Sequence, residues 1–327
     1  MTQTILITGG SGLIGEALCR RLGPRYRVVS LDRTPCRVSQ VQGEVADLLD
    51  AAGMQSLVDT HAPDVVIHCA GIAHQKVGQI DRETYMTVNS GATEQLAKRV
   101  AEKNPRVQFL FLSSVSVYGE LFTRNAIPED HPCRPSSDYA ESKLDAERRL
   151  LALHDSGELK HLQILRLAPV YDRDWHLNLA RRILAPKGLS YLRFGAGEQK
   201  MSALAKDNLT AFIAFCLSFP GDGVPGIYNV CDASPYAFNE MIRGFRQSGK
   251  YPWRPTLPVP LGAVKMLTRL AGAVFPRQKN WWHACHDKLA YDLVYDNQAM
   301  LATGFTPEHS LDTLLSGSSH WSKVSIS

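Results

Sequence analysis

The segment from Ile5 to Leu22 constrains the fold of this chain more than any other. It begins with the apolar run Ile5-Leu6-Ile7-Thr8, has glycines at 9, 10, 12 and 15, and continues as a helix-like run to Leu22. Such an apolar run predicts a buried strand, and glycine is needed where a tight turn brings the backbone close to a helix or a ligand. We therefore expect a strand, a tight turn and a helix whose N-terminal N–H groups face an anion.

A carboxylate ends the next apolar run of the chain. Residues 27–31 form this run, and Asp32 lies seventeen residues after Gly15, where a dinucleotide site places a carboxylate against the adenosine ribose. Because a carboxylate accepts from a free 2′-hydroxyl and repels a 2′-phosphate, Asp32 favours NAD(H), while the neighbouring Arg33 keeps NADP(H) as the alternative. The turn residues expected to contact the cofactor are Gly9, Gly12, Leu13, Ile14 and Gly15.

Strand-like and helix-like segments alternate through the first half of the chain. The strand-like runs are residues 5–8, 27–31, 65–69, 108–113 and 162–167. The helix-like segments between them are residues 12–22, 54–60, 83–102 and 138–154. Such alternation is typical of a parallel sheet with helices on both faces, so the expected fold is α/β, a Rossmann-type doubly wound parallel sheet.

The pattern loosens beyond Pro169. A helix at 208–217 and a strand at 226–230 are expected there, and prolines at 252, 255, 258 and 260 predict a linker-like passage. We expect residues 1–170 to form an NAD(P)-binding domain, to which part of the segment 204–230 returns. Residues 171–327 would then form a smaller C-terminal substrate-binding lobe.

Composition excludes several classes of protein. The net charge of +4 is small and the basic residues are scattered, so no nucleic acid is expected as a partner. The seven cysteines form no C-x-x-C pair, which favours reduced thiols in a cytoplasmic protein. The chain starts directly with its first strand, so no signal peptide is expected.

The chain contains one long apolar stretch near its C-terminus. Residues 257–275 are apolar but interrupted by Pro258, Pro260, Lys265 and Arg269, so no membrane span is expected. We expect residues 261–274 to form a helix packed on the substrate lobe. An amphipathic helix that contacts a membrane surface is the alternative.

Two titratable side chains lie one helical turn apart in the segment 138–154. Tyr139 and Lys143 are separated by four residues and therefore share a helix face. Tyrosine titrates near pH ~10, but a neighbouring cation favours the phenolate and lowers its pKa. We expect Tyr139 to be a general acid–base, Lys143 also to bond a nicotinamide ribose, and Ser114, at the end of an apolar run, to orient the substrate.

Together these residues resemble the extended short-chain dehydrogenase/reductase family, in its NAD-dependent nucleotide-sugar epimerase/dehydratase branch. The resemblance spans roughly residues 4–170 and rests on segments in the family's order and spacing. These segments are Thr8-Gly9-Gly10-Ser11-Gly12-Leu13-Ile14-Gly15, Asp32, Ala46-Asp47-Leu48, His68-Cys69-Ala70-Gly71, Val88-Asn89, Ser113-Ser114-Val115-Ser116-Val117-Tyr118-Gly119, Tyr139-x-x-x-Lys143 and Leu165-Arg166.

The resemblance implies a role for each matched residue. Ser114, Tyr139 and Lys143 would be catalytic, and no metal is implied. Cofactor contacts would include Asp47, Leu48, Ala70 and Asn89 in addition to Tyr139 and Lys143. Substrate contacts would include Ser114, Ser116, Asn178 and Lys200.

Two positions depart from the family pattern. The dehydratases of this branch carry an Asp-Glu pair where this chain has Val115 and Ser116, so elimination of water is disfavoured. Relatives usually present an arginine to the substrate diphosphate where this chain has Met201. Lys200 is one candidate to replace it, and Arg181, Arg182 and Arg193 are others, although a lost guanidinium is not a neutral change.

The expected function is an NAD-dependent nucleotide-sugar epimerase that acts at carbon 4 through a transient 4-keto sugar. A 4-ketoreductase that uses NAD(P)H is the alternative, because both reactions need the same three residues. A non-catalytic dinucleotide-binding regulatory protein is disfavoured, since such a protein has no need of all three. The expected partner is a nucleotide-sugar, and a homodimer is compatible with the resemblance.

Overall fold

The computed structural model describes residues 2–73, 80–119, 125–174, 177–218, 226–248 and 253–315, except for the side chains of residues 177, 178, 278–281, 283 and 284. The chain divides into two compact units. Unit 1 contains Met1–Gly119, Asp130–Leu167 and Thr210–Asn229. Unit 2 contains Glu120–Glu129, Ala168–Leu209 and Val230–Ser327.

A seven-stranded parallel sheet forms the centre of unit 1, as expected for a Rossmann-type fold. In chain order its strands are β1 (Thr4–Thr8), β2 (Arg27–Asp32), β3 (Gln42–Val45), β4 (Val65–His68), β5 (Gln108–Ser114), β6 (His161–Leu167) and β11 (Gly226–Val230). Their order in space is β11-β6-β5-β4-β1-β2-β3. The chain runs outward from β1 and returns to β4 on the other side of β1, and open α/β sheets bind ligands at the carboxyl ends of strands at such a reversal.

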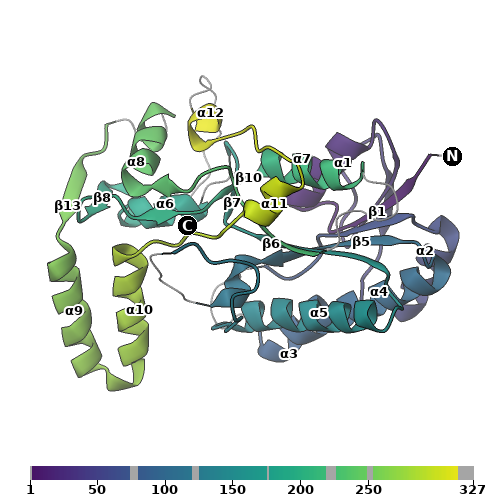
Figure 1. The fold of residues 1–327 in the computed structure, drawn as a ribbon, viewed down its shortest axis with the longest axis horizontal. Helices are drawn as coiled ribbons and strands as arrows, with labels where there is room; N and C mark the ends of the chain where they lie inside the picture. Colours follow the sequence, from purple (N-terminus) through teal and green to yellow (C-terminus); the bar gives the residue numbers. More distant parts are fainter. Residues whose placement is uncertain are drawn as a thin grey trace. The chain divides into compact units, whose positions relative to one another are not determined.

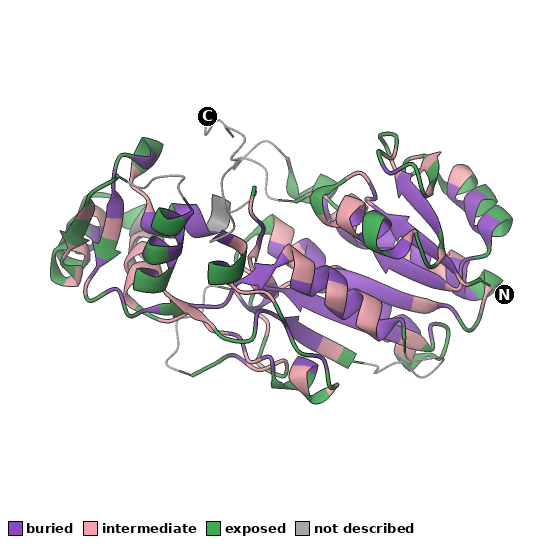
Figure 2. Ribbon diagram, turned by 90° about the horizontal axis from the view of Figure 1, so that it is seen from above, coloured by how far each residue is buried: buried purple, intermediate pink, exposed green. Residues whose placement is uncertain are grey.

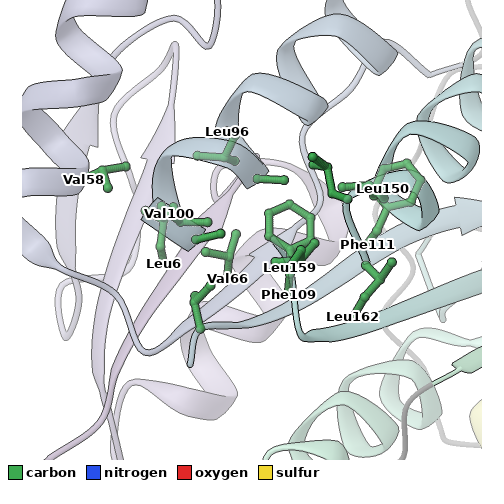
Figure 3. Close-up of a cluster of buried hydrophobic side chains, with 14 of the residues drawn as sticks. Leu6, Val58, Val66, Leu96, Val100, Phe109, Phe111, Leu150, Leu159 and Leu162 are labelled. Atoms are coloured by element: carbon green, nitrogen blue, oxygen red, sulfur yellow. The ribbon is translucent and has the colours of Figure 1, made fainter. Parts of the chain in front are cut away.

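Helices cover both faces of this sheet (Figure 1). The helices of unit 1 are α1 (Leu13–Leu22), α2 (Ala51–His61), α3 (Arg82–Tyr85), α4 (Ala92–Lys103), α5 (Asp138–Asp155) and most of α7 (Lys206–Cys216). Helices α2, α4 and α5 pack on one face, where Phe109 and Phe111 lie among their leucines and valines (Figure 3). The central strands of the sheet are buried (Figure 2). Each fully buried side chain of the size of leucine or phenylalanine contributes about 1.5–3 kcal/mol to the stability of the fold.

The helix expected over residues 83–102 is interrupted. Between α3 and α4 the chain forms a π-helical turn, Met86–Gly91. π-helical turns are rare in proteins, but those that occur are often found at functional sites. This one places Asn89 in a fully buried position.

Unit 2 has its own hydrophobic core and short two-stranded sheets. Its strands are β7 (Val170–Tyr171), β8 (Tyr191–Phe194), β9 (Lys200–Met201), β10 (Leu204–Ala205), β12 (Tyr236–Ala237) and β13 (Thr256–Val259). Its helices are α6 (Leu177–Ile183), α8 (Phe238–Gln247), α9 (Leu261–Val274), α10 (Lys279–Ala290), α11 (Gln298–Ala302) and α12 (Leu311–Leu315).

The described part of the proline-rich passage, which begins after Pro252, is not a linker. Residues 256–259 form β13, which pairs in parallel with β8 so that Pro258 lies opposite Arg193. A proline has no backbone N–H to donate, so it is tolerated where that N–H would face away from the neighbouring strand, and each strand of a two-stranded sheet has one edge without a neighbour.

All seven cysteines are free thiols. Among the described residues, no helix is both long and apolar enough to cross a membrane.

Candidate active site

Three glycines shape the turn between β1 and α1. Gly9 has a φ of 69°, in the left-handed region, and a Cβ on Gly15 would lie 2.1 Å from the Gly9 carbonyl oxygen. Gly12 is the N-cap of α1 and provides no side-chain cap, so the N–H groups of Leu13, Ile14 and Gly15 have no acceptor within the helix. A tight turn before an uncapped helix N-terminus fits a pyrophosphate group.

Asp32, the last residue of β2, faces this turn. One carboxylate oxygen accepts from the backbone N–H of Ser11 at 3.1 Å, and the other accepts from that of Thr34 at 3.4 Å. The side chain is half-buried, and each carboxylate oxygen accepts more than one hydrogen bond. The turn and this carboxylate together therefore fit a dinucleotide whose ribose carries a free 2′-hydroxyl.

This carboxylate makes the preference between NAD(H) and NADP(H) testable. We expect the wild-type protein to bind NAD(H) more tightly than NADP(H), because Asp32 would repel a 2′-phosphate. Asp32→Ala should reduce the ratio of the affinities for NAD(H) and NADP(H) about tenfold, because it removes the repulsion between the carboxylate and the 2′-phosphate. Arg33→Ala is the matched control and should increase this ratio, because it removes a neighbouring positive charge. Fluorescence titration of all three proteins with both reduced cofactors measures this, and equal or tighter NADP(H) binding by the wild type would contradict it.

Ser114 and Tyr139 come together at the junction of β5 and α5. Ser114 ends β5, and Tyr139 lies in the first turn of α5, whose N-cap Ser137 accepts from the backbone N–H of Ala140. Burial raises the pKa of the Tyr139 phenol, whereas its hydrogen bond with the Ser114 side chain lowers it, and the net pKa lies above the ordinary value. The ring of Tyr85 packs edge-on against that of Tyr139, with centroids 6.4 Å apart.

Lys143 lies one turn further along α5 and is buried. Its ammonium donates to the carbonyl oxygen of Leu112 at 2.9 Å and lies 4.7 Å from the centre of the Phe111 ring. Burial lowers the pKa of Lys143 to about 8. The expected lowering of the Tyr139 pKa by Lys143 is not observed in this structure, because burial of the phenol dominates and the ammonium is bonded to Leu112.

Asn89 connects α5 to the segment that follows β4. Its side-chain carbonyl accepts from the N–H of Ile72 at 2.7 Å, and its amide donates to Ser142 Oγ at 3.0 Å. A Cβ on Gly71 would lie 3.0 Å from Asn89 Oδ1 and 3.4 Å from Lys143 Nζ. Asn89 and Lys143 therefore converge on the carboxyl end of β4, beside the reversal of the sheet.

His68 is a buried polar residue near Lys143 for which the sequence predicted no role. It is fully buried between the hydroxyls of Thr8, 2.7 Å from Nδ1, and Thr93, 2.8 Å from Nε2. Burial lowers the pKa of His68 to about 3, with the charge of Lys143 adding to the effect, so the ring is neutral. Thr8 Oγ1 also accepts from the N–H of Ala70 at 3.1 Å. The signal that could have found His68 is a histidine at the end of an otherwise apolar strand.

The two residues after Ser114 lie in a 3-10 turn, Val115–Tyr118. Val115 is buried, and neither residue carries an acid. Ser116 Oγ is buried and has no hydrogen-bond partner among the described residues. A buried hydroxyl of this kind is costly unless something bonds to it, so Ser116 fits a polar ligand group.

Asp47 and Leu48 follow β3. The Asp47 carboxylate is exposed and accepts from the N–H of Leu49 at 3.0 Å. Leu48 is half-buried and packs against the large cluster of unit 1.

The remaining predicted substrate contacts belong to unit 2. Lys200 has an exposed side chain and lies in β9. Its neighbour Met201 is a buried member of the unit 2 core. Asn178 lies in α6, but its side chain is outside the part of the chain that the structure describes. Among the described residues, no three metal-ligating side chains form a group.

A parallel Rossmann sheet with a serine, a tyrosine and a buried lysine gathered at β5 and α5 defines an enzyme of the extended short-chain dehydrogenase/reductase type. More narrowly, the chain belongs to the NAD dependent epimerase/dehydratase family, whose model matches residues 5–231. This membership confirms the expected family and NAD as its cofactor.

Individual relatives cover most of the chain. It is 30% identical over 286 residues, 83% of each chain, to a UDP-glucose 4-epimerase of Vibrio cholerae. It is 26% identical over 268 residues, covering 81% of this chain and 78% of the relative, to the N-acetyl-alpha-D-glucosaminyl-diphospho-ditrans,octacis-undecaprenol 4-epimerase of Escherichia coli O157:H7. A crystal structure of UDP-glucuronic acid 4-epimerase from Bacillus cereus with NAD shares the fold, with a TM-score of 0.71 and 22% identity over 96% of both chains.

Proposed function

We propose that this protein is an NAD-dependent epimerase that inverts carbon 4 of a nucleotide-linked sugar. The observation that carries the proposal is that Ser114, at the end of β5, lies beside Tyr139 in the first turn of α5, one helical turn from the buried Lys143. The two relatives described above have names that specify a 4-epimerase, which supports the position of the reaction.

Each residue of the site has a distinct part in this reaction. Tyr139 takes the proton of the sugar hydroxyl and Ser114 holds the same oxygen. When bound, NAD would take a hydride from carbon 4 and later give it back, and Lys143 would bond the ribose next to the nicotinamide. Between these two transfers the 4-keto sugar turns, so that the hydride would return to the opposite face of carbon 4 while Tyr139 gives the proton back to the oxygen. Ser116, Asn178 and Lys200 would contact the substrate.

The structure supports dehydration, 4-keto reduction and a purely regulatory role less well than it supports epimerisation. Dehydration needs an acid and a base where this chain has Val115 and Ser116. A 4-ketoreductase is the alternative that retains support, because Met201 is buried in the core of unit 2 and cannot anchor a diphosphate as an arginine would. A regulatory protein without activity would not need the Ser114–Tyr139 pair and Lys143.

The relatives named above act on sugars that are attached to two different carriers. One relative's name specifies a UDP-sugar and the other a sugar on a polyprenyl diphosphate. Both present a diphosphate to the enzyme, and we propose the nucleotide carrier. Protection from heat by a panel of UDP-, GDP- and dTDP-hexoses and a short polyprenyl-diphosphate sugar identifies the carrier, because only bound ligands raise the Tm.

The epimerase proposal is tested by stoichiometry. With a UDP-hexose and only catalytic NAD, we expect the two 4-epimers to interconvert with no net formation of NADH. Product analysis by chromatography and absorbance at the NADH band measure both quantities. If product forms only from a 4-keto sugar and consumes one reduced nicotinamide per turnover, the ketoreductase replaces the epimerase.

A further inference from the structure

Helix α9 carries an apolar face that nothing described in unit 2 covers. Its inner face, which includes Leu261 and Val264, packs on the unit 2 core, and α9 lies alongside α10 (Figure 1). On the opposite face Met266 is 58% exposed, Leu267 62% and Leu270 57%. Val274, one turn further, is 69% exposed. Leu267, Leu270 and Val274 follow the i, i+3, i+7 spacing of one stripe along a helix.

The charges around this stripe all have the same sign. Lys265 and Arg269 are exposed and lie four residues apart, on the side of α9 between its inner face and Met266, and the exposed Arg277 follows the helix. Residues 241–286 contain no aspartate or glutamate, although the whole chain has 32 acidic residues. The same stretch contains eight basic residues, which are Arg243, Arg246, Lys250, Arg254, Lys265, Arg269, Arg277 and Lys279.

We propose that the exposed face of α9 binds the surface of an anionic lipid bilayer. A helix with an apolar stripe and a basic flank lies in the plane of the interface, with the stripe among the acyl chains and the cations at the headgroups. With fourteen residues α9 is about 21 Å long, which suits this orientation better than a span. This binding surface goes beyond the proposed epimerase activity, and the proposal does not depend on which sugar the enzyme uses.

The charges favour a bilayer over a second copy of the chain. Packing α9 against its own copy would place two stretches, each with eight basic residues and no carboxylate over residues 241–286, next to each other. Anionic headgroups supply that opposite charge, with each basic residue near the surface adding to binding.

Vesicle flotation of the full chain tests the proposal. We expect the wild type to float with vesicles of phosphatidylcholine and one-third phosphatidylglycerol at low salt. Leu267→Glu/Leu270→Glu should lower the bound fraction about tenfold or more, because it places charges in the apolar stripe. Val45→Glu/Leu189→Glu is the matched control: it adds the same charge at two equally exposed apolar residues outside α9, and should float like the wild type.

A second pair of variants separates charge from apolar contact. Lys265→Gln/Arg269→Gln should reduce binding to the anionic vesicles about tenfold, as should raised salt. Circular dichroism of every variant checks that it is folded. The proposal fails if the wild type does not float with anionic vesicles, or if Leu267→Glu/Leu270→Glu floats as well as the wild type. It also fails if sedimentation shows a wild-type dimer that this variant dissociates while neither protein binds vesicles.

Discussion

Tyr139→Phe is expected to reduce kcat about a hundredfold or more, the range for loss of a general acid–base. The substitution removes only the hydroxyl and keeps the ring that packs against Tyr85. The fold and the affinity for NAD should therefore be unchanged. Steady-state kinetics on a verified substrate, with calorimetric titration of NAD, measures the two effects separately.

Tyr85→Phe is the matched control for this prediction. Tyr85 is buried and its ring packs against that of Tyr139, but the proposed chemistry does not use its hydroxyl. We expect it to keep kcat within a few-fold of the wild type. Near-native turnover by Tyr139→Phe would show that another group moves the proton, whereas equal losses in both variants would point to packing instead of acid–base chemistry.

Glu147→Ala is expected to lower the free energy of unfolding by about 3–5 kcal/mol, the range for removing one partner of a buried ion pair. Glu147 accepts from Arg166 Nη2 at 2.7 Å and from the Ser113 hydroxyl, and both charged side chains are buried. Arg166 also donates to Tyr118 Oη at 2.9 Å, and Tyr118 donates to Asn229 at 2.7 Å. The substitution leaves the Arg166 cation buried without its carboxylate, and urea unfolding followed by circular dichroism measures the loss.

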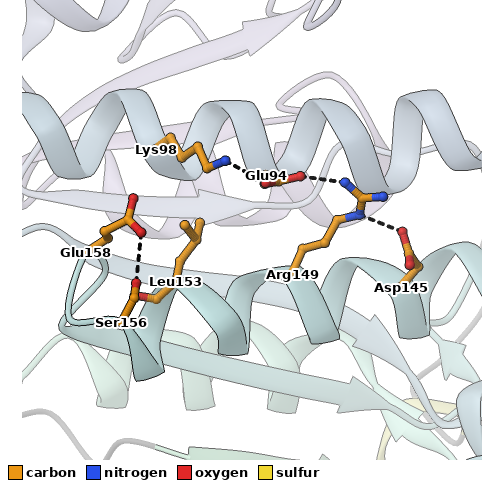
Figure 4. A network of polar contacts seen from close by, with 7 residues as sticks. All are labelled: Glu94, Lys98, Asp145, Arg149, Leu153, Ser156 and Glu158. Carbon is orange, nitrogen blue, oxygen red and sulfur yellow. Dashed lines mark hydrogen bonds and ion pairs between the residues drawn. The ribbon is translucent and has the colours of Figure 1, made fainter.

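A surface network of similar composition provides the control. Arg149 pairs with Asp145 at 2.7 Å and with Glu94 at 2.6 Å (Figure 4), but its side chain is 44% exposed. Because exposed pairs contribute little, Arg149→Ala should cost no more than about 1 kcal/mol.

A double substitution tests the cause of the loss. Glu147→Met/Arg166→Met removes both buried charges and should be more stable than Glu147→Ala. A loss below about 1 kcal/mol for Glu147→Ala would mean that the pair is better solvated than its burial indicates.

The sequence alone determined six of the seven strands of the sheet, and the cofactor loop. The strand expected at residues 226–230 is β11, and the runs expected at 27–31 and 162–167 match β2 and β6 to within a residue at each end. These strands are covered on both faces by helices, so nearly every residue must be apolar and the run is visible locally. The glycine turn and Asp32 were visible for a similar reason, since turn geometry and a ribose contact both depend on residues close in sequence.

The structure alone decided which distant residues meet. The edge strand β3 is largely exposed and shows no apolar run, and β13 contains a proline that only its pairing with β8 makes acceptable. His68 between two threonines, Asn89 between a loop and α5, and the buried pair of Glu147 and Arg166 each depend on partners that no local pattern names.

For helix α9 too, the sequence predicted the helix, and only the structure showed which of its faces is covered. Its sequence predicted a helix, and the expectation that it packs on the lobe holds for one of its two apolar faces. An apolar side chain has the same hydrophobicity whether it is covered or exposed. Only the packing of the folded chain decides which face remains in water, and therefore which face is available to bind something else.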